Sequence, residues 1–479
     1  MVDICERVWY AMSIETYFYA KEQIFMDKLE QKICDIIDSK QDEIIAFGRD
    51  IWMHAELGYR EFRTAGKFAD VLKSLNIETT EGHAITGVKG YLKGKDYKGT
   101  TVALMGEYDA LPIANHPDAN PETGASHCCG HNAQITGVMG AAYALSDPEI
   151  KEAMDGNIVF FGVPAEEFVE VDLKSQMIDE GKIGYGGGKC ELIRVGALDD
   201  IDIVVGHHTS PAVELSLSNG TNNGFVNKSI TFTGRAAHAA GAPQNGVDAY
   251  NAAKVAQMAV DVQRESFRDK DTVRIHGFTV FGGSATNVIA DKIVLEYYVR
   301  ANNVAAVKDA SKKFDRAMRA GAIATGAGMK IKTFAGYLPL VPIKETKSVV
   351  EALEDANASV GGKYKITGVG ELKHSTGSTD YGDLANLMPT IQFGTGGFTG
   401  VLHNPDVMPS DEYLAYVMTA KVFALAGYKL LKNGGDYAKA MMDSFEAVMT
   451  KEEYIAYMDS MMSEEVIEMN PLPKLDDMN

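Results

Sequence analysis

Three short segments decide the fold, because each joins an apolar run to a polar cluster: residues 101–109 read TVALMGEYD, residues 157–167 read NIVFFGVPAEE, and residues 201–208 read IDIVVGHH. Short, continuous apolar runs are typical of strands that are buried in a sheet. Residues 133–145 lie between the first two segments, and their many Ala and Gly residues suit a helix packed closely on that sheet. Strands that alternate with helices predict an α/β architecture.

The same pattern continues toward both ends of the chain. Up to about residue 80, apolar positions such as Ile44, Ile51 and Trp52 are compatible with helices packed on a core. Near the other end, residues 389–393 predict a strand and residues 411–431 a helix. The α/β pattern therefore flanks a central region of different character.

That central region predicts a small separate domain. Its expected order is strand, helix, strand, strand, helix, strand, which matches a ferredoxin-like unit. We place these elements at residues 229–233, 247–266, 272–280, 293–300, 304–320 and 329–334. The predicted division is a larger domain in two parts (1–223 and 339–435), an inserted domain (224–338) and an acidic, Met-rich helical extension (436–479) that serves packing or an interface.

Composition narrows the class of protein. The chain has 479 residues, 46% hydrophobic and 23% charged, as expected for a globular protein of two domains. No apolar run reaches the roughly 20 residues of a membrane span, and the N-terminus lacks the apolar core of a signal peptide, so we expect a cytoplasmic protein. The net charge of −20 argues against nucleic acid or an anionic membrane as a partner. Five cysteines do not form a disulfide scaffold.

The polar clusters at the strand ends predict one site. Ligands gather at the carboxyl ends of strands in open α/β sheets, so Asp109, the Glu166–Glu167 pair and the His207–His208 pair should face one crevice. Two adjacent glutamates often form only part of a solvent-exposed surface. This pair follows a strand and a proline, and its side chains point different ways in an extended chain. One carboxylate can then bind a metal while the other transfers protons.

The segment HCCGH at residues 127–131 adds further candidate ligands. Thiolate and imidazole suit zinc and, less exclusively, other transition metals. Taken alone, Cys129 and His131 are equally consistent with a buried thiol near a structural histidine, and His403 is equally ambiguous. Together with Glu167 and His208, these residues provide enough ligands for two metal ions about 3.5–4 Å apart.

Five ordered motifs make the chain resemble peptidase family M-twenty over residues 45–430. They are HAELGYRE (54–61), MGEYDALP (105–112), CGHN (129–132), PAEE (164–167) and GRAAHAAGAP (234–243). The resemblance is strongest to the branch with a Cys-x-His motif, which includes p-aminobenzoyl-glutamate hydrolases and related dipeptidases with a GSTD motif, here residues 377–380. It implies a zinc-peptidase-like mixed sheet flanked by helices, with the inserted ferredoxin-like domain as a lid and dimerisation domain.

The resemblance also implies roles for the candidate residues. Two divalent ions per chain, zinc or manganese or possibly cobalt, would be held by five ligands, and Glu166 would be the general base. The metal ligands are Cys129, His131, Glu167, His208 and His403. His208 is chosen over His207 because the family ligand stands three residues before a proline, here Pro211. Cys128 is then a packing residue, and Asn132 replaces an aspartate usual in the branch.

Three further residues are implied in the inserted domain. His238 would reach the active site of a partner subunit and stabilise the oxyanion, which implies a homodimer formed through this domain. A lone histidine is otherwise more often structural. Asn287 and Arg300 resemble positions that bind the substrate carboxylate or the oxyanion.

The predicted function is hydrolysis of an amide bond in a small N-acyl or aminoacyl amino acid, or in a dipeptide-like substrate with a free carboxylate. One alternative is a binding or regulatory protein that keeps the fold without turnover, against which the intact Glu166 speaks. Another is a metal-independent cysteine hydrolase that uses Cys129 with His131.

Overall fold

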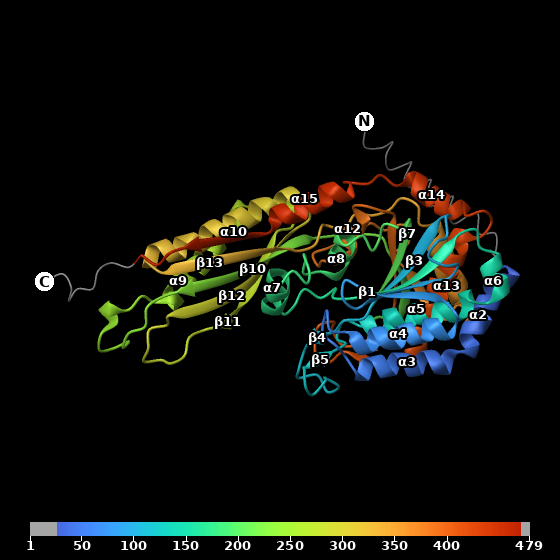
Figure 1. Ribbon diagram of the computed structural model, residues 1–479, viewed down its shortest axis with the longest axis horizontal. Helices are drawn as coiled ribbons and strands as arrows, with labels where there is room; N and C mark the ends of the chain where they lie inside the picture. The colour runs from blue at the N-terminus through green and yellow to red at the C-terminus, as the bar shows by residue number, and fades with distance from the viewer. Residues whose placement is uncertain (1–25, 471–479) are drawn as a thin grey trace.

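The computed structural model describes residues 26–470, which form an elongated molecule with two bodies (Figure 1). One body is built on an eight-stranded sheet and the other on a five-stranded sheet. The predictions that concern residues 1–25 and 471–479 lie outside the described residues.

The larger body contains the mixed sheet. Its strands are β1 (Glu78–His83), β2 (Gly87–Tyr91), β3 (Thr101–Glu107), β6 (Asn157–Val163), β7 (Ile203–Thr209), β8 (Glu214–Ser218), β14 (Lys365–Thr367) and β16 (Thr390–Thr395). They lie in the order β1-β2-β6-β3-β7-β16-β8-β14. The four central strands β6, β3, β7 and β16 are parallel, whereas β2 and β8 run antiparallel to their inner neighbours. The predicted α/β fold with a mixed sheet is confirmed.

Helices cover this sheet. They are α2 (Lys28–Ser39), α3 (Gln41–Met53), α4 (Phe62–Ser74), α5 (His131–Leu145), α6 (Pro148–Glu152), α7 (Val171–Asp179), α8 (Gly188–Arg194), α11 (Lys347–Ala358), α12 (Tyr381–Ala385) and α13 (Thr419–Leu431). Three short pairs of strands lie in the loops: β4 (Leu111–Pro112) with β5 (Ala125–Ser126), β9 (Thr221–Asn222) with β15 (His374–Ser375), and β17 (Phe398–Thr399) with β18 (Met408–Pro409).

Strand β3 shows why the central strands of the sheet are apolar at every position and do not alternate apolar with polar residues. Val102 and Leu104 belong to the core that includes α5 and α13, whereas Ala103 and Met105 belong to the core that α8 shares with the smaller body. Because both faces of the strand are covered, every position is buried. The stretch Tyr413–Leu431 is long and apolar enough to cross a membrane, but it is entirely buried inside the protein and forms part of the first core.

The smaller body follows the predicted order of elements. These are β10 (Gly224–Thr233), α9 (Ala249–Asp261), β11 (Arg274–Phe281), β12 (Lys292–Ala301), α10 (Val304–Thr325) and β13 (Gly328–Ala335). The strand order β11-β12-β10-β13 is that of a ferredoxin-like sheet. We keep the name inserted domain for residues 224–338, and its exact bounds stay a prediction.

The C-terminal extension differs from the helical prediction. Helices α14 (Asp436–Ser444) and α15 (Lys451–Met461) are followed by strand β19 (Ser463–Ile467), which pairs antiparallel with β13. The prediction of helix is wrong for this strand because a tertiary contact decides it: the edge of β13 offers backbone partners, and Arg319 forms a double ion pair with Glu465 at 2.5 Å. In Figure 1, α15 and β19 run from the larger body along the inserted domain.

Candidate active site

Four parallel strands deliver the candidate residues to one edge of the sheet. Strand β3 leads into Asp109, β6 into Glu166 and Glu167, β7 carries His208 near its end, and the loop after β16 carries His403. Cys129 and His131 lie at the start of α5, which packs on β3. The carboxyl ends of parallel strands meet at one edge, so segments far apart in sequence form a single cluster.

The Cys129 thiol lies at the centre of this cluster. Its Sγ is 3.5 Å from Nε2 of His208 and 3.3 Å from Nε2 of His403. The same nitrogen of His403 is 3.5 Å from Oε1 of Glu167. Candidate ligand atoms form three groups, within each of which they lie no more than 4.8 Å apart: Cys129 with His131 and His208, Cys129 with Glu167 and His403, and Glu107 with His131 and Glu166. The first two groups share only Cys129, so its sulfur would belong to the donor sets of both ions.

Two buried atoms of the cluster have no hydrogen-bond partner. They are Nε2 of His131 and Oε1 of Glu167. A buried polar atom without a partner is costly, and a metal ion supplies the missing interaction. The residues therefore fit divalent metal ions, and the thiolate and imidazole donors favour transition metals.

Backbone geometry and neighbouring groups fix the ligands. Gly130, Ala165 and His403 have φ of 76°, 51° and 67°, so the chain adopts left-handed conformations next to Cys129 and His131, next to Glu166, and at His403. The N–H of His403 donates to the carbonyl of Cys128 at 2.9 Å, which ties the His403 loop to the Cys129 segment. These contacts explain how loops from opposite ends of the chain meet.

Glu166 lies beside the donor groups. Its Oε2 is 3.9 Å from Nε2 of His131, and the side chain is buried. Burial, with the nearby carboxylates Glu107 and Glu167, raises the pKa of Glu166 well above its usual value. A raised pKa suits a carboxylate that accepts a proton during a reaction.

Sequence reasoning missed a buried ionic group under the site. Lys189 Nζ forms ion pairs with Glu107 and with Asp380, the latter at 2.5 Å, and all three side chains are fully buried. Glu107 Oε2 also lies 3.2 Å from Nε2 of His131. Glu107 stands at the end of β3, two residues before Asp109. Its position at a strand end could have marked it in the sequence as a site residue. Nothing in the sequence linked Lys189 to it.

Three polar residues near the ligands turn away from the metal cluster. His207 Nε2 is 2.7 Å from Thr395 Oγ1, and its ring packs against Phe393. Burial lowers the pKa of His207 well below its usual value, so the ring is neutral. Asn132 donates to the Tyr416 hydroxyl at 3.0 Å. Cys128 Sγ lies 3.2 Å from Ser126 Oγ. These residues support the loops.

The inserted-domain candidates occupy two places. His238 and Asn287 are exposed and adjacent, because the N–H of Ala239 donates to the carbonyl of Asn287 at 2.9 Å. Their loops lie at the end of the inserted domain that points away from the larger body (Figure 1). Arg300 instead lies at the junction of the two bodies, where Nη1 donates to Ser378 Oγ at 2.9 Å. The structure thus brings the five metal-ligand candidates and Glu166 together, with Arg300 near them, and leaves His238 and Asn287 apart.

An α/β fold with a cluster of candidate metal donors and an adjacent buried carboxylate is typical of metal-dependent hydrolases. The chain belongs to the family described as peptidase family M20/M25/M40, whose model matches residues 103–424. It is 26% identical to the Xaa-Arg dipeptidase of Mus musculus, over 85% of this chain and 90% of that protein. It is 25% identical to one component of the p-aminobenzoyl-glutamate hydrolase of Escherichia coli (strain K12), over 83% and 80% of the two chains.

A solved structure supports the fold. The chain is similar to YXEP of Bacillus subtilis, described as a dinuclear metal-binding peptidase, with a TM-score of 0.57 and 22% identity, covering 82% of this chain and 99% of that one. The family match confirms the predicted family, and the solved structure shows a similar fold.

Proposed function

We propose that this chain is a two-metal amidohydrolase that acts on small N-acyl or aminoacyl amino acids and dipeptide-like compounds. Cys129, His131 and His208 would hold one ion, and Cys129, Glu167 and His403 the other. The single observation that carries this proposal is that the two groups of donors share the Cys129 sulfur. Zinc, manganese and cobalt all suit this donor set.

Bound divalent ions would supply Lewis-acid chemistry and a water of lowered pKa. Glu166 would accept the proton of that water at a carboxylate oxygen and deliver it to the amine nitrogen as the C–N bond breaks. Its place beside the donors, and its burial among other carboxylates, support this role.

His238 would stabilise the oxyanion in the active site of a second copy of the chain. The exposed position of its loop, at the outer end of the inserted domain, supports action in trans. Helix α9 of the same domain exposes Tyr250 and Met258, and Val262 directly after it has 75% of its surface accessible. Exposed apolar side chains on one helix suit a two-fold contact between copies, so we propose a homodimer.

Arg300 and Asn287 would bind the substrate carboxylate or the oxyanion. The position of the Arg300 guanidinium at the junction of the bodies supports this role, whereas Asn287 would act beside His238 from the second copy. The names of the two similar proteins given above state a dipeptide and p-aminobenzoyl-glutamate as their substrates. These names support a small amide as the substrate of this chain. We also propose that the protein is cytoplasmic.

The alternative of a metal-independent cysteine hydrolase has less support. Burial raises the pKa of the Cys129 thiol, so a free thiolate is disfavoured unless a metal binds it. The decisive experiment measures hydrolysis of a series of N-acyl amino acids and dipeptides by protein treated with a chelator, before and after zinc, manganese or cobalt is restored. Hydrolysis that needs the metal supports the proposal. Hydrolysis that survives chelation and stops on alkylation would favour the cysteine enzyme.

A further inference from the structure

Residues 165–168 carry the proposed base Glu166 and the proposed ligand Glu167, and they lie after strand β6 outside any helix or strand. Ala165 has a φ of 51°, a left-handed conformation that costs free energy in a residue other than glycine. A strained backbone keeps one conformation only where neighbouring groups hold it. The position of both carboxylates therefore depends on the groups that bind this segment.

The larger body holds part of the segment. Three buried polar side chains bind its backbone at 2.6–2.8 Å, those of Glu61, Asp109 and Lys174. The two carboxylates accept from the N–H groups of Ala165 and Glu167, and the ammonium donates to the carbonyl of Glu167. Within residues 26–470, no donor of this body binds the carbonyl of Glu166 or of Phe168.

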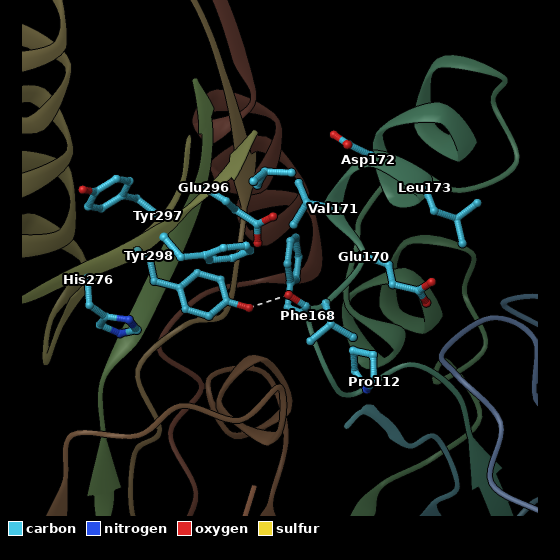
Figure 2. Close-up of a pocket in the computed structure, with 14 residues that line it drawn as sticks. Pro112, Phe168, Glu170, Val171, Asp172, Leu173, His276, Glu296, Tyr297 and Tyr298 are labelled. Atoms are coloured by element: carbon cyan, nitrogen blue, oxygen red, sulfur yellow. Dashed lines mark hydrogen bonds between the residues drawn. The ribbon is translucent and has the colours of Figure 1, made fainter. Parts of the chain in front are cut away.

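The inserted domain binds these two carbonyls. The Tyr337 hydroxyl donates to the carbonyl of Glu166, and the Tyr298 hydroxyl donates to the carbonyl of Phe168. Figure 2 shows the second of these hydrogen bonds between β12 and the facing loop. Tyr337 lies two residues after the end of β13. Hydroxyl groups of one body thus hold the backbone on either side of a proposed ligand in the other body.

Packing fixes the rings that carry these hydroxyl groups. The Phe168 ring packs against Phe225 and Tyr337 with centroids 5.5 and 6.0 Å apart. Phe225 packs in turn against Tyr298 and Tyr337, at 4.6 and 4.7 Å. The Arg300 guanidinium lies over the Tyr298 ring, 4.8 Å from its centroid. Aromatic rings at these distances attract one another, and a packed ring directs its hydroxyl one way.

We propose that Tyr337 and Tyr298 are positioning residues, which hold the Glu166 carboxylate beside the metal ligands by binding the backbone of its segment. Without the hydroxyl of Tyr337, a buried carbonyl would lack a donor, and the segment would shift to regain one. Proton transfer needs hydrogen-bond reach, and a displacement of about 1 Å can cost about 100-fold in rate.

This inference rests on the proposed amidohydrolase function and adds a second role for the inserted domain. His238 would act in the site of a second copy, whereas the two tyrosines act in the site of their own chain. The position of the inserted domain relative to the larger body then sets the position of the proposed base. Each active site would need the inserted domains of both copies.

The test removes single hydroxyl groups and keeps the rings. The metal-loaded full chain is compared with Tyr337→Phe and Tyr298→Phe on the N-acyl amino acid or dipeptide that it hydrolyses fastest. We expect kcat to fall at least about 10-fold for Tyr337→Phe and severalfold for Tyr298→Phe, with KM changed less than about 2-fold. Metal content, measured by elemental analysis on the same preparations, should equal that of the parent.

Tyr91→Phe is the matched control. It removes a hydroxyl that donates to Asp200 Oδ2 at 2.9 Å from another buried ring. Tyr91 pairs with Val159 near the start of β6, away from the end of the strand that leads to Glu166. This variant should keep the parental kcat, KM and metal content.

A second measurement asks whether Tyr337 acts through Glu166. Glu166→Asp withdraws the carboxylate by one methylene, so the activity that remains depends less on the position of the backbone. In that background Tyr337→Phe should lower kcat less than about 3-fold, because changes that act through one group are not additive. The same comparison with Tyr91→Phe gives the background for independent changes.

The outcomes separate this inference from the function on which it rests. Parental kcat for both Tyr337→Phe and Tyr298→Phe, with metal-dependent hydrolysis by the parent, would overturn the positioning role and leave the amidohydrolase standing. Loss of metal in step with activity, or a full loss of kcat again in the Glu166→Asp background, would show a structural role and overturn it too. Tyr298→Phe decides the question where Tyr337→Phe does not fold. No hydrolysis of any N-acyl amino acid or dipeptide by the parent would overturn both.

Discussion

Asp109 Oδ1 lies 3.0 Å from Nδ1 of His131, and both side chains are fully buried. Burial alone would raise the pKa of Asp109, but the hydrogen bond and charge of His131 outweigh it and lower that pKa. An ionised carboxylate only accepts, so Nδ1 of the ring carries a proton. When the ring loses its second proton to serve as a metal ligand, Nε2 presents the lone pair. The second oxygen of Asp109 accepts from the N–H of Glu167 at 2.8 Å. One carboxylate therefore orients a candidate ligand at the start of α5 and another in the loop after β6.

We expect Asp109→Asn to weaken metal binding by about 10–100-fold, because the amide can no longer accept both hydrogen bonds in the same way. Competition with a chelator of known affinity measures the change. Asp118→Asn, which alters a carboxylate in a nearby loop bonded to the Trp52 indole, is the matched control and should bind metal like the parent. Equal affinities for all three proteins would contradict the orienting role.

The metal-loaded protein should contain up to two transition-metal ions per chain, since the two donor groups share one sulfur. Elemental analysis of freshly purified protein checks this number. Cys129→Ser should lower the content of both ions, whereas Cys34→Ser, a buried thiol outside the cluster, should not. Protein that holds no metal and gains no activity from added metal would refute the two-metal centre.

Glu166→Gln should retain metal and lose nearly all turnover, whereas Glu167→Ala should lose metal as well. The difference follows from assigning proton transfer to one carboxylate and coordination to the other. Metal content and kcat are measured on the same preparations. If both variants kept metal and activity, the pair would be no more than a polar surface.

A shared active site predicts complementation between inactive variants. Mixing His238→Ala with Glu166→Gln under conditions that exchange subunits should restore one site with both parental residues in each mixed dimer. Activity is followed over time, with exchange verified by a labelled subunit. Each variant mixed with itself is the control. Proven exchange without recovery would place the role of His238 within its own chain.

The buried ion pairs of Lys189 should matter for stability. Lys189→Met leaves Glu107 and Asp380 without their cation, which we expect to cost about 3–5 kcal/mol in the free energy of unfolding. Lys182→Met removes an exposed pair with Glu180 and should cost less than about 1 kcal/mol. Urea unfolding of the two variants and the parent gives both values. A loss for Lys189→Met as small as that for Lys182→Met would contradict the prediction.

The strand ends could be predicted from the sequence because apolar runs such as residues 101–105 and 157–163 are followed within three residues by acidic residues. Because Cys129 and His131 are separated by a single residue, the sequence also showed them as a pair. Lys189 was not readable, because a buried lysine is recognisable only once its partners on other strands are placed. The same holds for β19, whose conformation depends on an edge formed by residues far earlier in the chain. Local patterns thus predicted the elements and the ligands, and long-range pairing supplied the rest.

Strand β19 also has a consequence for biosynthesis. The chain emerges from the ribosome in sequence order, so β13 is made long before the strand that covers its edge. During that interval the growing protein carries an unpaired strand edge, the kind of surface that invites pairing with another nascent chain. Lys330 on β13 places a positive charge along this edge until its ion-pair partner Glu464 on β19 is made. Because a charged side chain on an open strand edge disfavours pairing with another chain, we expect Lys330 to hinder such pairing during synthesis.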